Sequence, residues 1–184
     1  MDFERILLEK LGDHKDRIRH VKGVYERALE LGLIHGGDPF VLKQAALLHD
    51  LCKYDTIESQ VEMIDDLELV KKYQDTKVVY HALAAAAYVK KVLGINDPKV
   101  IEAIQYHMWG KPDMNLETMI IVVSDYSEPN RHFKEAKIVY ECALKNLKEA
   151  YLLSLQFTVE HLLKDNVSPH IEQLECIEYY KETK

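Results

Sequence analysis

The sequence predicts an all-α fold, built as one helical bundle. Apolar residues recur at spacings of three and four along most of the chain, which is the period of a helix that buries one face. Only seven glycines and five prolines interrupt the 184 residues, and nearly all stand where a helix could begin or end. The pattern gives helical segments near residues 2–10, 14–32, 39–53, 57–73, 78–93, 98–108, 115–126, 134–164 and 169–182, with ends placed to within about 2–4 residues.

Three of these segments also carry end signals. Asp38-Pro39 and Asp97-Pro98 each place a capping carboxylate before a proline at the first helical position, where the missing N–H removes no hydrogen bond. Gly94 is typical of the C-terminal cap of the 78–93 helix. The other segments depend on apolar periodicity alone. Val78-Val79 and the stretch 120–123 are β-prone, but they lie inside longer helical patterns, so no strand is predicted.

Composition predicts a globular domain and excludes several other classes of protein. Hydrophobic residues make up 47% and charged residues 30%, and no repeat or linker divides the chain, so we expect a single domain over 1–184. The net charge of −7 argues against a broad basic surface for nucleic acid. The longest apolar runs, 82–87 and 120–123, are far shorter than the ~20 residues that cross a bilayer. With no signal-peptide pattern and no CxxC pair among three cysteines, a cytoplasmic protein with reduced cysteines is expected.

His49-Asp50 is the first feature that indicates chemistry. The dipeptide ends the apolar run 45–48 near the end of a predicted helix, where an ionised carboxylate is costly to bury unless a cation or hydrogen bonds compensate it. Asp125 has the same problem, because it shares a helical face with Ile121 and Val122. A lone dipeptide of this kind is more often a solvent-exposed helix end, so the pattern is weak evidence by itself.

Three histidines lean toward the interior of predicted helices. His20 shares a face with Val24, His107 shares one with Ala103, and His81 stands in the first turns of its helix. Each alone is more often a core or surface histidine than a ligand. Together with His49-Asp50 and Asp125, however, five helices each offer a His or Asp, and helical bundles build metal centres from facing helices. Imidazoles and carboxylates without thiolates suit iron, manganese or zinc, in one or two ions. The remaining histidines, expected to be solvated, are His14, His35, His132, His161 and His170.

The order of these residues resembles a known superfamily. Arg17-x-x-His20, His49-Asp50-x-x-Lys53, His81, His107 and Asp125 follow one another as in the HD-domain metal phosphohydrolases. The stretches 103–110 (AIQYHMWG) and 124–131 (SDYSEPNR) are similar to the YqeK family within that superfamily. The resemblance covers about residues 14–165, the motif-bearing core, and leaves the C-terminal helix 169–182 outside it.

The resemblance implies an HD-domain helical bundle and an activity. Members of the YqeK family are symmetrical diadenosine tetraphosphate hydrolases that use iron and release ADP; manganese or cobalt could substitute. Metal ligation by His20, His49, Asp50 and Asp125 is implied, with His81 and His107 completing a second metal position or facing substrate phosphates. The partners implied are a dinucleoside polyphosphate and its product ADP.

Three further residues receive roles by the same resemblance. Arg131 matches the arginine of an Asp-x-x-Glu-Pro-x-Arg element and should contact a phosphate, with a surface arginine at a helix start as the alternative. Lys53 matches a lysine after the HD dipeptide and joins Asp50 and Arg131 as a candidate catalytic residue, although a solvated lysine at a helix end is equally compatible. Met108 stands where the family has a small hydroxyl residue, and Ser124 where it has alanine, so Met108 alters a nucleotide contact rather than the reaction.

Several other functions remain open at this stage. The chain could be another HD phosphohydrolase, acting on nucleoside monophosphates, deoxynucleoside triphosphates or guanosine tetraphosphate. It could also be a non-catalytic nucleotide sensor, or a structural bundle with unrelated surface histidines. A second apolar face along 133–165 would favour a homodimer.

Overall fold

The structure, a computed structural model that describes residues 1–183, is built from helices, and no strand occurs in that range. The predicted all-α bundle is therefore confirmed. The elements are α1 (Phe3–Leu11), α2 (Lys15–His35), α3 (Pro39–Leu48), α4 (Ile57–Ile64), α5 (Leu67–Lys72), the 3-10 turn η1 (Lys77–Val79), α6 (Tyr80–Lys91), α7 (Pro98–Gln105), α8 (Leu116–Ser127), α9 (Lys134–Ala143), α10 (Leu147–Lys164) and α11 (Ile171–Glu182).

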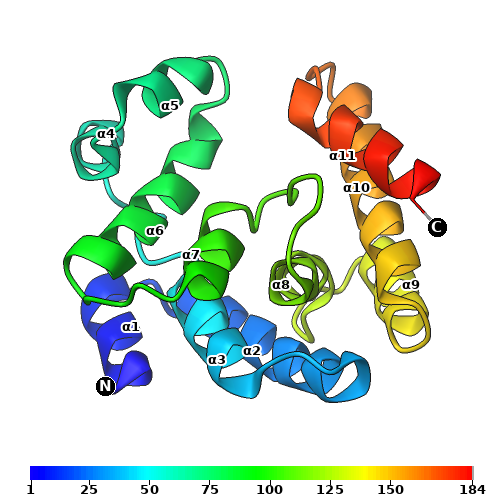
Figure 1. The fold of residues 1–184 in the computed structure, drawn as a ribbon, viewed down its shortest axis with the longest axis horizontal. Coiled ribbons are helices and arrows are strands. Elements are labelled where there is room, and N and C mark those ends of the chain that lie inside the picture. Colours follow the sequence, from blue (N-terminus) through cyan, green and yellow to red (C-terminus); the bar gives the residue numbers. More distant parts are fainter. Residues whose placement is uncertain (184) are drawn as a thin grey trace.

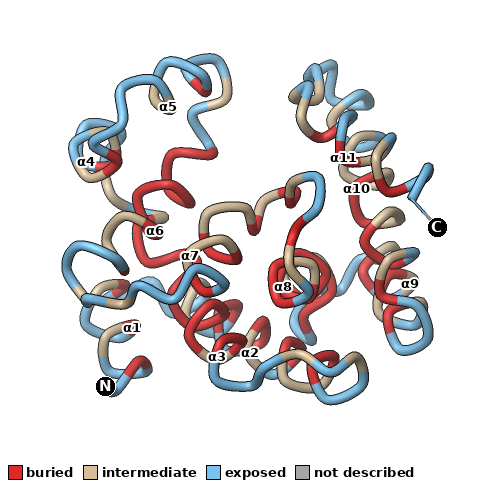
Figure 2. The backbone as a smooth tube through the Cα atoms, viewed as in Figure 1, coloured by how far each residue is buried: buried red, intermediate tan, exposed pale blue. Residues whose placement is uncertain are grey.

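Helix α8 is the centre of the bundle. It packs against α2, α3, α7, α9 and α10, and Figure 1 shows it nearly end-on between the α2–α3 pair and the α9–α10 pair. Ile120, Ile121, Val123 and Ser124 are fully buried although they point to different sides of the helix, which is expected of a helix enclosed by neighbours. The tube in Figure 2 is red along α8 for this reason. Asp125 is thus carried by a helix that five other helices surround.

The other helices extend the bundle on two sides. On one side α6 packs against α4 and α7; on the other α10 packs against α9 and α11 (Figure 1). The chain therefore forms a continuous core that reaches from Phe3 of α1 to Tyr180 of α11. Both predicted N-caps are confirmed, since Asp38 Oδ1 accepts from the N–H of Phe40 at 2.8 Å and Asp97 Oδ1 accepts from that of Lys99 at 2.9 Å.

Two predicted long helices are wrong, because each is divided by a polar cap. The 57–73 segment breaks at Asp65, which adopts a left-handed conformation with φ 62°, and Asp66 caps the next helix by accepting from the N–H groups of Glu68 and Leu69. The 134–164 segment breaks before Asn146, whose side chain caps α10. Short polar side chains at these positions bind backbone groups and end the helix, although the apolar spacing continues across the break.

Two other predicted helices end earlier than expected, at functional positions. The 39–53 segment ends at Leu48, so that His49 and Asp50 lie in a turn, and the 98–108 segment ends at Gln105, just before His107.

The predicted homodimer through 133–165 stays a prediction. Among residues 1–183, none of the helices combines the length and the apolar character that a membrane crossing requires. The three cysteines are free thiols, with Cys52 and Cys176 buried.

Candidate metal centre and nucleotide site

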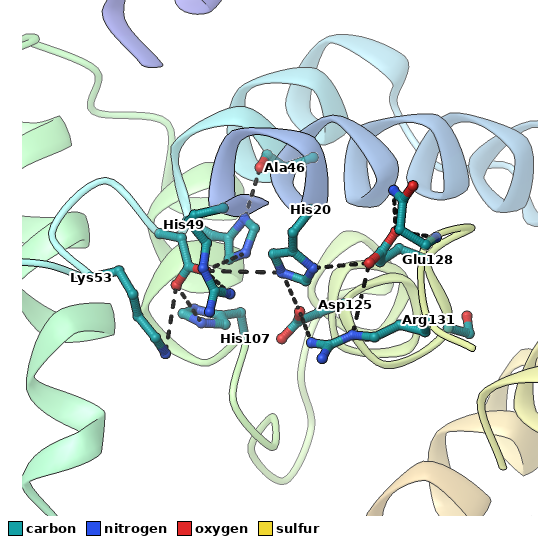
Figure 3. A network of polar contacts seen from close by, with 12 residues as sticks. His20, Ala46, His49, Lys53, His107, Asp125, Glu128 and Arg131 are labelled. Carbon is teal, nitrogen blue, oxygen red and sulfur yellow. Dashed lines mark hydrogen bonds and ion pairs between the residues drawn. The ribbon is translucent and has the colours of Figure 1, made fainter. Parts of the chain in front are cut away.

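The six side chains predicted as metal ligands meet at one place. His20 comes from α2, His49 and Asp50 from the turn after α3, His81 from the start of α6, His107 from the turn after α7, and Asp125 from α8. Three groups of these residues have ligand atoms within 4.8 Å of one another: His20 with His49 and Asp50, His49 with His107 and Asp125, and Asp50 with His81 and His107. In Figure 3, His20 lies between His49 and Asp125, with Lys53 and Arg131 at opposite ends of the network.

Asp50 stands between two pairs of histidines. Its Oδ1 lies 3.1 Å from His81 Nε2 and 3.7 Å from His107 Nε2, while its Oδ2 lies 3.5 Å from His49 Nε2 and 4.0 Å from His20 Nε2. The side chain is only 2% exposed. A carboxylate whose two oxygens face different imidazole pairs has the geometry of a bridge between two cation positions.

Local hydrogen bonds set the histidine tautomers. His49 Nδ1 donates to the carbonyl oxygen of Ala46 at 2.7 Å, and His107 Nδ1 donates to that of Ile104 at 2.8 Å. His81 Nδ1 makes the same contact with Val78. Because a carbonyl oxygen only accepts, each Nδ1 carries a proton, and in the neutral imidazole the lone pair lies on Nε2, which faces the centre. Metal-ligating histidines are usually oriented in this way.

His20 is oriented by a carboxylate instead. Its Nδ1 lies 3.2 Å from Glu128 Oε1, and its Nε2 lies 2.9 Å from Asp125 Oδ1. A carboxylate behind an imidazole raises the basicity of the opposite nitrogen, which strengthens a bond from Nε2 to a cation. Through this contact Glu128 joins the site, whereas the sequence had indicated it only as the glutamate of the Asp-x-x-Glu-Pro-x-Arg element.

The residues present fit a divalent cation. His20 Nε2, His49 Nε2 and Asp50 Oδ1 are buried polar atoms without a hydrogen-bond partner in the protein. Such atoms are costly to bury unless something binds them, and their convergence here indicates a shared cation. The donor set is imidazole and carboxylate, with no thiolate among the three candidate groups, which suits iron, manganese or zinc.

Electrostatics keep Asp50, Asp125 and His107 in the protonation states that a metal requires. Burial lowers the pKa of His49, but Asp50 raises it further, so the net shift is upward. Burial alone would raise the pKa of Asp50, but His49 and His81 hold that pKa well below its usual range. Burial likewise opposes ionisation of Asp125, and His20 lowers the pKa of this carboxyl. Burial, with His49 and His81 nearby, lowers the pKa of His107 to about 3. At neutral pH the centre presents ionised carboxylates and a neutral His107 imidazole.

Arg17 completes the surroundings of Asp50. Its Nη1 donates to Asp50 Oδ2 at 2.9 Å, in a pair that is buried on the aspartate side. The sequence offered one signal for this contact, because Arg17 lies three residues before His20 and so shares its helical face. The partner, Asp50, stands 33 positions away and could not be identified from spacing.

The three other predicted site residues have different surroundings. Arg131 is 38% exposed, and its guanidinium lies 3.6 Å from Asp125 Oδ1. Lys53 Nζ lies 3.2 Å from His81 Nε2 and 4.0 Å from Asp50 Oδ1, and burial lowers the pKa of Lys53 although Asp50 opposes the shift. Met108 is partly buried and lines a cavity beside His107.

Two of the cavities that Arg131 lines also border predicted metal ligands. One, of about 230 Å³, is lined by His107, Met108, Asp125, Tyr126, Phe133 and others, and it adjoins a wider hollow of about 570 Å³ that shares Tyr126 and Phe133. The other, of about 350 Å³, is lined by Arg17, Arg19, His20, Tyr54, Arg131 and His132 among others. His132, expected to be a solvated residue, is exposed but also lines this second cavity. Ligands can therefore reach the centre from two cavities, both of which Arg131 lines.

Comparison with known proteins agrees with this geometry. The family model described as the HD domain matches residues 17–130. A protein of Halalkalibacterium halodurans named symmetrical bis(5'-nucleosyl)-tetraphosphatase is 36% identical over 82% of this chain and 81% of its own length. A protein of Bacillus subtilis with the same name is 32% identical over 86% of this chain and 84% of its own.

A solved structure shares the whole fold. The crystal structure of a predicted HD superfamily hydrolase involved in NAD metabolism from Clostridium acetobutylicum superposes with a TM-score of 0.92, at 30% identity, over 99% of this chain and 96% of that one. The buried His and Asp centre, the family match and these relatives agree with one another. This chain belongs to the HD-domain family of phosphohydrolases, in the group whose curated members are symmetrical bis(5'-nucleosyl)-tetraphosphatases.

Proposed function

We propose that this protein hydrolyses diadenosine tetraphosphate at its central anhydride bond. One water is consumed, and two ADP molecules leave. The observation that carries the proposal is the convergence of four imidazoles and two carboxylates on one buried point, with Arg131 lining two cavities beside it. The relatives named for this activity cover most of the chain and support the choice of substrate.

The cofactor of this proposal is a divalent metal, iron by resemblance, with one or two ions per chain. His20, His49, Asp50 and Asp125 would hold one ion, and Asp50 would share a second with His81 and His107. A cation held there would supply Lewis-acid polarisation of phosphoryl oxygens and activation of the attacking water. Manganese or cobalt would fit the same donors, and a site with one ion would leave His81 and His107 facing the substrate phosphates.

The chain's own residues supply positioning and charge. Glu128 orients His20, Arg17 orients Asp50, and Arg131 offsets the charge of the phosphates. The leaving group is a terminal phosphate of ADP with a second pKa of ~6, so it departs as an anion without a strong general acid. Lys53 lines neither of these two cavities, so its part in this proposal is to position His81.

One nucleoside half of the substrate would occupy the cavity beside His107. Tyr126 and Phe133 form an edge-to-face pair there with ring centroids 5.5 Å apart, and Met108 lines the same wall. Apolar and aromatic walls with a few polar groups are typical of small-molecule sites. Met108 offers no hydroxyl donor in this position, so it contributes apolar contact to the nucleoside. A cytoplasmic enzyme acting on free nucleotides is the setting of this proposal.

Product analysis tests the proposal directly. The purified protein, supplied separately with Fe²⁺, Mn²⁺ or Co²⁺, is incubated with diadenosine tetraphosphate in water enriched in oxygen-18. We expect ADP as the only product, with one labelled oxygen on the β-phosphate of half of the molecules. AMP plus ATP as initial products, or no reaction with any of the three metals, would contradict it. Phosphate or tripolyphosphate released from simple nucleotides would favour another HD phosphohydrolase activity.

A further inference from the structure

We propose that the cavity between α2 and the turn after α3 binds the second adenosine of the substrate, with Tyr54 as its stacking surface. This inference rests on the proposed function. A symmetrical dinucleotide cut at its centre has two identical halves, so the reacting phosphates must have space for a nucleoside on each side. The two cavities that Arg131 and predicted metal ligands line offer these two spaces, and only the one beside His107 is used so far.

The shape and position of this second cavity fit a nucleotide. Its volume is about 350 Å³, within the range of roughly 300–1,000 Å³ that is usual for small-molecule sites. His20 and Arg131 both line it, so a phosphate chain that contacts Arg131 borders this cavity. Tyr54 lines the same cavity.

Tyr54 has surroundings that favour stacking on a base. Its ring stacks on the imidazole of His14 with centroids 3.6 Å apart and planes 7° apart, yet the residue is 50% exposed. The stacked partner covers one face of the ring, and the exposed remainder borders the cavity. A ring held parallel to a neighbour loses little conformational freedom when a base stacks on it. Neither Tyr54 nor His14 belongs to the buried core or to the predicted metal ligands, although the Tyr54 hydroxyl lies beside Arg17, which contacts Asp50.

The charges along the cavity suit a phosphate chain. Three arginines, Arg17, Arg19 and Arg131, line it together with two carboxylates, Asp16 and Glu128, on a protein whose net charge is −7. Arg19 is paired with Asp16, but both side chains are largely exposed, at 65% and 92%, so this pair is weak and a phosphate can replace the carboxylate. His132 adds a further hydrogen-bond donor. The cavity therefore offers arginines for a phosphate chain and the Tyr54 ring for a base.

Comparing two substrates isolates the second base. Adenosine 5'-tetraphosphate carries the same four phosphates as diadenosine tetraphosphate and lacks the second adenosine; its central cleavage would give ADP and pyrophosphate. kcat/KM is measured for both substrates with the metal-loaded wild-type protein, Tyr54→Ala and Tyr54→Phe. Phe40→Ala serves as the matched control, because Phe40 is an exposed aromatic residue outside both cavities.

We expect Tyr54→Ala to lower kcat/KM for diadenosine tetraphosphate by roughly 5- to 150-fold, the range found when a stacking ring is removed. The value for adenosine tetraphosphate should stay within about twofold, since that substrate has no second base to lose. Tyr54→Phe keeps the ring and should resemble the wild type. Phe40→Ala should change neither value.

Three results would overturn the inference, and they differ from a failure of the proposed function. An equal loss on both substrates would mean that Tyr54 supports the centre through His14 and α2. No loss on either substrate would mean that the second base binds elsewhere, and a loss in Tyr54→Phe equal to that in Tyr54→Ala would mean that the hydroxyl acts and not the ring. If the proposed function itself is wrong, the wild-type protein will already fail to release ADP from diadenosine tetraphosphate, before any variant is compared.

Discussion

Replacing Glu128 by glutamine tests whether the carboxylate behind His20 sets the affinity for a metal ion. Glu128 is 3% exposed, and its Oε1 lies 3.2 Å from His20 Nδ1. Its other oxygen accepts from the backbone and side-chain amides of Asn130, at 2.7 and 2.8 Å. Glutamine keeps the shape and one acceptor oxygen, so the substitution removes mainly the negative charge that supports a bond from His20 Nε2 to a cation.

The expected magnitude follows from these contacts. Loss of such an outer partner typically lowers metal affinity or activity by about 10- to 100-fold, or ~1.4–2.8 kcal/mol. Burial argues for the upper end of that range, since the charge is little screened. The bonds from Asn130 and the guanidinium of Arg131, 3.9 Å away, already disperse part of the charge and argue for the lower end. We therefore expect a loss of roughly 30-fold in metal affinity.

A competition titration against a chromophoric chelator measures this loss. Turnover at saturating metal should largely recover, because Glu128 acts on the metal through His20. Glu117→Gln is the matched control: Glu117 is also buried, at 2% exposure, but its Oε1 binds Lys99 and the N–H of Asp38, outside the centre. Glu128→Gln with wild-type metal affinity, or an equal loss in Glu117→Gln, would refute the reasoning.

The remaining predictions concern Asp50, Arg131 and Glu172, the last of which lies in α11. Asp50→Ala should strip the metal and abolish turnover, because both Asp50 oxygens face imidazole pairs; metal analysis that shows full occupancy would contradict the assignment. Arg131→Ala should leave metal content intact and lower kcat/KM by about 2–4 kcal/mol in transition-state terms, and loss of metal would assign it a structural role instead. Burial opposes ionisation of Glu172, but Lys72 and Tyr73 lower its pKa in the folded protein. The ionised Glu172 therefore stabilises the fold above its unfolded pKa of about 4.3. This stability is lost as pH falls through the lower pKa of the folded state. Denaturant titrations at pH 7 should show Glu172→Gln less stable by about 1–3 kcal/mol, and the difference should shrink toward pH 3; a constant difference would contradict this.

The sequence predicted which polar side chains converge at the candidate metal centre, because periodicity indicates the polar residues that lie on apolar helical faces. His49-Asp50 ends an apolar run and Asp125 lies on an apolar face, so the burial of the dipeptide and the partial burial of Asp125 could be expected from residue spacing. The breaks at Asp65-Asp66 and before Asn146 were missed because apolar spacing continues across them. At both places the decisive event is a side-chain cap, which competes with the helix over only a few residues.

Contacts between distant segments could not be predicted in the same way. Glu128 pairs with His20 across 108 positions, and Arg17 pairs with Asp50 across 33. Each of these residues has an ordinary context in its own segment, since a glutamate before proline or an arginine in a first helical turn requires no special explanation. The cavity that includes His132 was missed for the same reason, because it is formed by three segments that meet only in the fold.

The two kinds of support for the imidazoles explain why some ligands were easier to predict than others. His49 and His107 each follow a helix and donate to a carbonyl in its last turn, where carbonyl groups lack partners within the helix. Each therefore carries its orienting group within three residues, and each helix directs the negative end of its dipole toward the site of the cation. His20 lies inside α2, where the carbonyls are already bonded, so its orienting group has to come from another segment. That is why Glu128, at the end of α8, is required, and why the predicted loss of metal affinity in Glu128→Gln should arise at His20 while His49 and His107 remain oriented.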